Sequence, residues 1–142
     1  MLVSVLQEAR VNEDNVKVIG DESVIRTVIE ALREVYDPEI PVNIYDLGLI
    51  YEIHAAKTED GRPHIKILMT LTAIGCPVIG PLAMYVEEAI RDRIPDAEVE
   101  VDITFDPPWT PERITKEGRE MFKAMYGYDI VEQWIEAYRE RG

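Results

Sequence analysis

The side chain in this sequence that can act both as a nucleophile and as a soft metal ligand is Cys76, the single cysteine among 142 residues. It ends the stretch MTLTAIGC, which is typical of a strand that leads toward a helix. Backbone amides at a helix N-terminus lower a thiol pKa from about 8.5 to between roughly 3.5 and 7.5, which produces a thiolate nucleophile or metal ligand. Free cysteine is also among the most buried residue types, so an inert packed thiol fits the position equally well.

Carboxylates and hydroxyls form a second group of chemically active side chains. The segment DPEIPVNIYDLG, residues 37–48, carries Asp37, Glu39 and Asp46 together with two prolines. Carboxylates on such a loop act in acid–base chemistry or, more commonly, bond to nearby amides. Thr70 and Thr72 alternate along a predicted strand and therefore point to the same side.

A third stiff segment, DPPW, follows a predicted strand and ends at Trp109. We interpret Trp109 as a hydrophobic anchor, with an exposed recognition aromatic as the alternative.

Hydrophobic spacing predicts the elements that position these groups. Alternation and turn residues predict strands at 49–57, 64–73 and 97–105. Helical spacing and capping residues predict helices at 21–36, 80–93, 111–126 and 130–141. The predicted helix 80–93 has Tyr85 on its buried stripe. The expected fold is an α+β two-layer domain, a three-stranded mixed sheet with helices mainly on one face and an extra C-terminal helix.

The predicted organisation is an N-terminal arm over residues 1–20, for which a hairpin is the suggested form, a domain over 21–127 and a C-terminal helical extension over 128–142. The last helix places Trp134 on an apolar stripe that must be buried. Two arrangements would bury it: packing on its own domain, or pairing with a second copy of the chain in a homodimer.

Charge and composition indicate which partners, location and source organism to expect for this protein. The formal net charge is −13, from 28 acidic and 15 basic residues, which disfavours nucleic acid and anionic membrane surfaces as partners. The sequence shows neither a membrane span nor a signal peptide, so a cytoplasmic location is expected. Two glutamines and three asparagines among dense Glu, Arg and Lys indicate a thermophile.

Three segments together, DPEIPVNIYDLGLIY, MTLTAIGCP and DPPWTPERIT, resemble the metal-sulfur cluster biosynthesis family. That family includes SufT-like maturation factors and the PaaD-like subunit of phenylacetate degradation. The resemblance spans about residues 23–126. It implies a functional site that consists of Asp37, Glu39, Thr70, Thr72 and Cys76, and we expect these residues to converge in space. Ile74 stands where the family commonly has proline.

The resemblance implies a non-catalytic factor that assembles or transfers iron–sulfur clusters, with scaffold or carrier proteins and client apoproteins as partners. A soft thiolate suits iron, whereas a stable cluster usually needs four protein ligands. A single Cys76 therefore points to a transient cluster, or to a bridge between two copies. Two other functions stay open: a thiol enzyme in which Cys76 attacks an electrophile with Asp37 or Glu39 as acid or base, and an adaptor in which the acidic surface and the C-terminal helix dock a partner and Cys76 is merely packed. The predicted interaction residues are Trp109 and Trp134.

Overall fold

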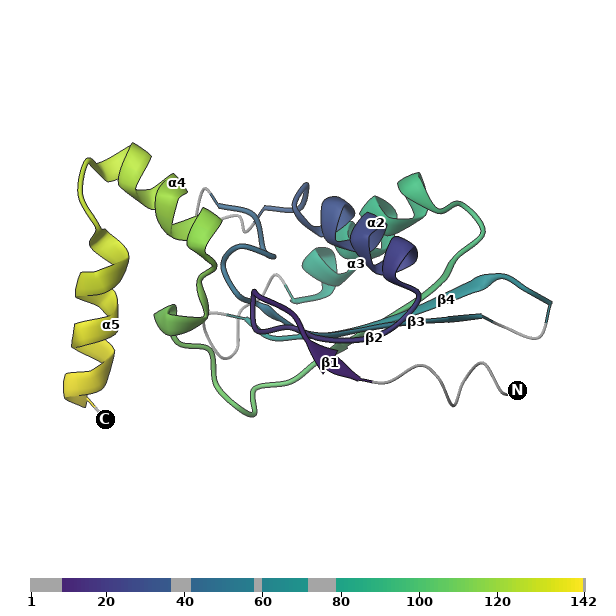
Figure 1. Ribbon diagram of the computed structural model, residues 1–142, viewed down its shortest axis with the longest axis horizontal. Coiled ribbons are helices and arrows are strands. Elements are labelled where there is room, and N and C mark those ends of the chain that lie inside the picture. The colour runs from purple at the N-terminus through teal and green to yellow at the C-terminus, as the bar shows by residue number, and fades with distance from the viewer. Residues whose placement is uncertain (1–8, 37–41, 58–59, 72–78, 142) are drawn as a thin grey trace.

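The computed structural model describes residues 9–36, 42–57, 60–71 and 79–141. Its centre is a five-stranded sheet with the order β1-β2-β3-β4-β5 (Figure 1). The α+β class and the mixed sheet are confirmed. The expected number of three strands is wrong, because the segment taken as an N-terminal arm contributes two further strands.

The N-terminal hairpin consists of β1 (Arg10–Val11) and β2 (Lys17–Gly20), which pair antiparallel. Asn12 closes its turn by accepting hydrogen bonds from the amides of Asp14 and Val16, each at 2.9 Å. β2 then pairs in parallel with β3, so this hairpin is part of the sheet. A hairpin in this segment agrees with the sequence prediction. Its place in the sheet was not predicted, because the pairing of β2 with β3 joins residues more than thirty positions apart.

Helix α2 (Glu22–Leu32) has its N-cap at Asp21, where the predicted range begins, and ends earlier than predicted. The Asp21 carboxylate accepts hydrogen bonds from the amides of Ser23 and Val24 and from the Ser23 hydroxyl. The Ser23 bond, followed by the two amide bonds, lowers the pKa of Asp21. The helix terminates at Arg33, and Tyr36 already belongs to a β-bridge with Asn43.

Three further strands and the helix between the last two of them complete the sheet. β3 (Ile50–Lys57) and β4 (Pro63–Met69) are antiparallel, and β4 is parallel to β5 (Glu98–Ile103). Helix α3 (Ile79–Arg93) connects β4 to β5 and lies beside α2 on one side of the sheet (Figure 1). The side chains that fill the space between these helices and the sheet are fully or almost fully buried: Val18, Ile25, Val28, Leu32, Ile53, Ile65, Ile67, Met69, Leu82, Val86 and Ile90.

The opposite face of the sheet carries polar side chains, as the alternation in the third predicted strand indicates. Lys66 lies 3.7 Å from Glu100 and 3.6 Å from Asp102, and His54 lies 2.8 Å from Glu52. These pairs are exposed or half-exposed, so each contributes little stability, about 0 to 1 kcal/mol. The prediction of one covered face and one open face holds for this sheet.

The C-terminal part begins with a short turn, η1 (Pro111–Arg113), and continues with α4 (Lys116–Tyr126) and α5 (Ile130–Arg141). The single helix predicted over 111–126 is divided because Thr115 adopts an extended conformation and caps α4. The predicted end at Gly127 is confirmed, with φ +82°. In Figure 1, α4 and α5 lie at one end of the sheet, opposite the turn between β3 and β4.

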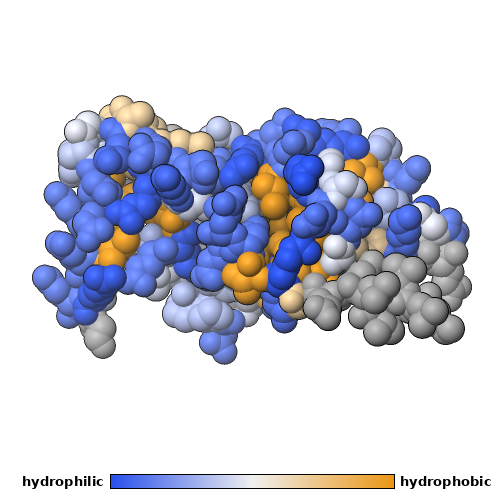
Figure 2. Space-filling view, viewed as in Figure 1, coloured by the Kyte–Doolittle hydropathy of each residue, from blue (hydrophilic) through white to orange (hydrophobic). Residues whose placement is uncertain are grey.

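Hydrophilic side chains predominate on the face drawn in Figure 2, and an apolar strip crosses its middle. In the described part of the chain, no helix is both long enough and apolar enough to cross a membrane.

Candidate functional site

The loop before β3 is built around a buried carboxylate. Asp46 is fully buried, and Asn43 is 2% exposed. Asn43 Nδ2 donates to Asp46 Oδ2, and the Asp46 amide donates to Asn43 Oδ1, both at 2.8 Å. Arg33, at the end of α2, lies 3.4 Å from the same carboxylate. A buried charge is tolerable only when it is paired and hydrogen-bonded, and Asp46 meets both conditions.

Asp46 also joins this loop to the start of α4. The Thr115 hydroxyl donates to Asp46 Oδ1 at 2.7 Å, and the Thr115 amide donates to the Asp46 carbonyl at 2.9 Å. The same hydroxyl accepts from the Gly118 amide at 3.0 Å and so caps the helix. A Cβ at Gly118 would lie 2.6 Å from the Asp46 carbonyl oxygen, which explains the glycine.

A second junction joins the two residues that follow Asp46 to two residues that precede Thr115. Trp109 Nε1 donates to the Leu47 carbonyl at 2.7 Å, and Arg113 Nε donates to the Gly48 carbonyl at 3.0 Å. Gly48 has φ +81°, and a Cβ there would overlap the Arg113 carbonyl oxygen. The first and third sequence segments are therefore locked together by side-chain and backbone hydrogen bonds.

Arg113 continues this junction across the start of β3. Its guanidinium lies 4.2 Å from the centre of the Tyr51 ring, and Tyr51 donates from its hydroxyl to the Pro107 carbonyl at 2.6 Å. Burial lowers the pKa of Arg113, although an arginine side chain stays protonated at neutral pH. The cation–π contact compensates part of the lost solvation.

We call the hydrogen-bonded junction of residues 42–49 with residues 109–118 the platform. Thr70 connects the second segment to this platform. Its amide donates to the Leu49 carbonyl at 2.8 Å, and its side chain is fully buried. The hydroxyl oxygen has no hydrogen-bond partner among the described residues. A buried unpaired hydroxyl costs about 1 to 3 kcal/mol, and each such group in a native fold needs an explanation.

Of the five predicted site residues, the structure describes Thr70 alone. Asp37, Glu39, Thr72 and Cys76 lie outside the described residues, so their convergence stays a prediction. The residues on either side of segment 37–41 are held together by the bridge between Tyr36 and Asn43. Thr70, two residues before segment 72–78, bonds to Leu49 of the same loop region. The chain therefore enters both segments from one hydrogen-bonded part of the molecule.

Comparison with known proteins identifies the family of this chain. Residues 25–107, more than half of the chain, match the iron-sulfur cluster assembly protein family. The chain belongs to this family.

Two relatives and one solved structure show how far the similarity extends. A protein of Porphyromonas gingivalis named Fe-S protein maturation auxiliary factor is 39% identical over 95 residues, which are 64% of this chain and 83% of that protein. The Fe-S protein maturation auxiliary factor SufT of Staphylococcus aureus is 34% identical over 83 residues, 58% of this chain and 89% of that protein. A crystal structure of a DUF59 domain of unknown function from Bacillus anthracis has a TM-score of 0.62 at 31% identity and covers 71% of this chain and 92% of its own. The predicted family, including the SufT-like resemblance, is confirmed.

In this family member both tryptophans predicted to mediate interactions make contacts within the chain. Trp109 meets Tyr138 of α5 edge to face with ring centres 6.2 Å apart, and Trp134 meets Phe122 of α4 at 5.1 Å. Both side chains are half-buried, and these contacts hold α5 against η1 and α4. A role in docking another protein stays a prediction.

The two histidines are placed on strands, as predicted, and His54 bonds to Glu52. The described residues hold no group of three or more histidine, cysteine or acidic side chains arranged to bind a metal ion.

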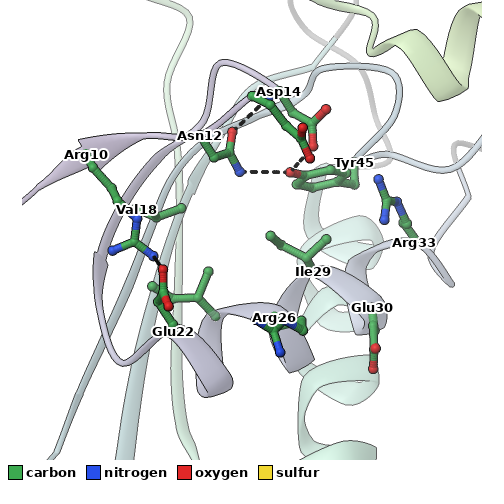
Figure 3. A pocket seen from close by; sticks show the side chains of 12 residues that line it. Arg10, Asn12, Asp14, Val18, Glu22, Arg26, Ile29, Glu30, Arg33 and Tyr45 are labelled. Carbon is green, nitrogen blue, oxygen red and sulfur yellow. Dashed lines mark hydrogen bonds and ion pairs between the residues drawn. The ribbon is translucent and has the colours of Figure 1, made fainter.

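A hollow of about 550 Å³ lies between the N-terminal hairpin and α2 (Figure 3). Val18, Ile25 and Ile29 supply its apolar part. Its upper end in Figure 3 is formed by the Tyr45 hydroxyl, which donates to Asp14 at 2.7 Å and accepts from Asn12 at 3.1 Å. Burial and the bond to Asp14 raise the pKa of Tyr45, so the ring stays neutral. These hydrogen bonds join the hairpin to the first family segment.

Sequence reasoning missed Arg33, Arg113 and Thr115, which hold the platform together. The available signal for Thr115 was a threonine before a helical pattern, which is a standard N-cap. No local signal marked Arg33 or Arg113, because their partners are more than ten positions away along the chain.

Proposed function

We propose that this protein is a non-catalytic maturation factor that helps to deliver iron–sulfur clusters to apoproteins, with the cluster as cargo. The observation that carries the proposal is the family membership, together with relatives named Fe-S protein maturation auxiliary factors that this chain covers along most of their length. The proposed partners are a scaffold or carrier that supplies the cluster and the client that receives it. A cytoplasmic location, where thiols stay reduced, is part of the proposal.

Cys76 is the proposed point of contact with the cluster, as a transient ligand. The chain has no second cysteine, so a partner or a second copy must supply the remaining thiolates of a four-ligand site. The structural support is indirect: Thr70 precedes the Cys76 segment, and its buried hydroxyl has no partner among the residues that the structure describes. The packing of the strand does not need that hydroxyl, whereas a polar site adjoining the strand end does.

An anaerobic titration tests the ligand role. Purified full-length protein is mixed with a cluster donor, and absorption spectra are recorded for the wild type and for Cys76→Ser. A matched control is Cys76→Ser combined with Ala137→Cys, which restores one thiol on the exposed side of α5. We expect a cluster spectrum for the wild type and for neither variant. Identical spectra in all three proteins would contradict ligation by Cys76.

A cellular assay tests the maturation role itself. In cells that lack the native copy, the activity of an iron–sulfur enzyme is measured after expression of the wild type or Cys76→Ser. We expect restoration by the wild type alone. Restoration by both proteins would show that the factor acts through protein contacts without its thiol, and restoration by neither would contradict a maturation role.

A further inference from the structure

A second hollow, of about 350 Å³, lies on the molecular surface between α3 and the residues that follow α2. One wall is a single face of α3, because its residues recur at helical spacing: Tyr85, Glu88, Ala89 and Asp92. The other wall consists of Glu34, Val35 and Tyr36. The hollow is thus built from the residue directly before segment 37–41 and from the helix directly after segment 72–78.

Two aromatic rings border this hollow and face solvent. Tyr36 is 54% exposed and Tyr85 is 56% exposed, with Met84 beside it at 59%. The prediction that Tyr85 is buried is wrong, because α3 buries Leu82, Val86 and Ile90, which lie four residues apart, and Tyr85 falls beside that stripe. A cluster of large exposed apolar side chains is typical of an interaction site.

The charged residues that line this hollow are all acidic. Glu34 is already paired with Arg93 at 2.9 Å. Glu88 and Asp92 have no cation within 4 Å in the part of the chain that the structure describes. Aromatic faces and carboxylates both attract cations, so the two tyrosines and the two carboxylates favour the same kind of ligand.

We propose that this hollow binds an arginine side chain presented by a segment of a partner protein. A planar guanidinium can stack on a tyrosine ring while it donates to a carboxylate, which a lysine ammonium does less well. The inference rests on the proposed function for the identity of the partner, a protein that takes part in cluster delivery. Binding there would hold the partner next to the helix that follows the Cys76 segment.

A peptide titration followed by amide NMR tests the proposal on the full-length chain. The probe is the blocked tripeptide acetyl-Leu-Arg-Leu-amide, and its control contains citrulline, which has nearly the same shape without the charge. We expect saturable shifts at the amides of Tyr36, Tyr85, Glu88 and Asp92. Tyr85→Ala and the double variant Glu88→Gln with Asp92→Asn should each weaken binding about two- to fivefold.

Matched controls separate the hollow from general surface effects. Tyr126→Ala removes a tyrosine of similar exposure on α4, and Glu120→Gln removes a charge from the same helix; both should bind the peptide like the wild type. Equal shifts with the citrulline peptide, or no saturable shift, would overturn the proposal. Shifts at these amides that grow with protein concentration alone would assign the hollow to a second copy of the chain and would also overturn it.

The titration contains no cluster, so its result is independent of the proposed function. Cys76→Ser should bind the arginine peptide like the wild type, and Tyr85→Ala should give the wild-type cluster spectrum with a free donor. Peptide binding without any cluster spectrum would contradict the ligand role of Cys76 and leave the arginine site standing.

Discussion

Thr70 combines complete burial with a hydroxyl that has no partner among the described residues. Thr70→Val keeps the shape and removes the unpaired group, so we expect the free energy of unfolding to stay the same or to rise by about 1 kcal/mol. Maturation activity in cells should fall nevertheless if the hydroxyl serves the site. Urea denaturation measures the first quantity and enzyme activity the second. The control is Thr27→Val, which removes a hydroxyl that is bonded to the Ser23 carbonyl on the exposed side of α2. A loss of more than about 1 kcal/mol at Thr70 would show that its hydroxyl is paired in the fold.

Gly48 shows how a single missing side chain permits the platform to form. Gly48→Ala introduces both an unfavourable positive φ and an overlap with the Arg113 backbone, so we expect a loss of at least about 2 kcal/mol. Gly61→Ala is the matched control, because Gly61 has φ +86° with open space around it. It should lose only about 1 kcal/mol. Thermal or urea unfolding of both variants gives the comparison, and equal losses would mean that the Arg113 backbone moves aside at little cost.

At the scale of elements, α2 depends on its N-cap. Asp21→Ala should lower the free energy of unfolding by about 1 kcal/mol at neutral pH, since it removes the bonds to the first turn. The pKa of Asp21 is lowered in the fold, so this contribution is present above the unfolded-state pKa of about 4 and is lost as pH falls through the folded-state pKa. The difference between wild type and Asp21→Ala in urea denaturation should therefore shrink below about pH 4. With Asp21→Asn, which caps without titrating in this range, stability relative to Asp21→Ala should persist in acid. A difference that stays constant with pH for Asp21 would contradict the ionised cap.

At the scale of the whole molecule, the C-terminal helix belongs to the chain's own fold. Val131 is fully buried and Ile135 is 5% exposed, against α4 and η1. The apolar stripe thus has cover without a second copy, although it packs at one end of the sheet rather than on the open face. We expect light scattering to report a monomer. A chain that ends at Gly127 would expose Phe122 and Trp109 and should unfold at a lower temperature. A full-length dimer that becomes a folded monomer on truncation would instead support the homodimer.

The sequence by itself determined the features that depend on neighbours along the chain. These are the cap at Asp21, the end of α4 at Gly127, and the strands β3 and β4. Each follows from residue periodicity or from a side chain that bonds within a few positions, and such effects need no knowledge of the fold.

Tertiary structure alone decided which distant groups meet. The parallel pairing of β2 with β3, the bonds from Asp46 to Thr115 and from Arg113 to Gly48, and the exposure of Tyr85 all depend on how packed elements are placed against one another. Asp46 illustrates the difference: its residue type predicted only a local amide bond, whereas its carboxylate also accepts a hydrogen bond from a residue 69 positions away. A buried carboxylate must find donors wherever the fold brings them, and one-dimensional spacing carries no information about donors that the fold supplies from a distance.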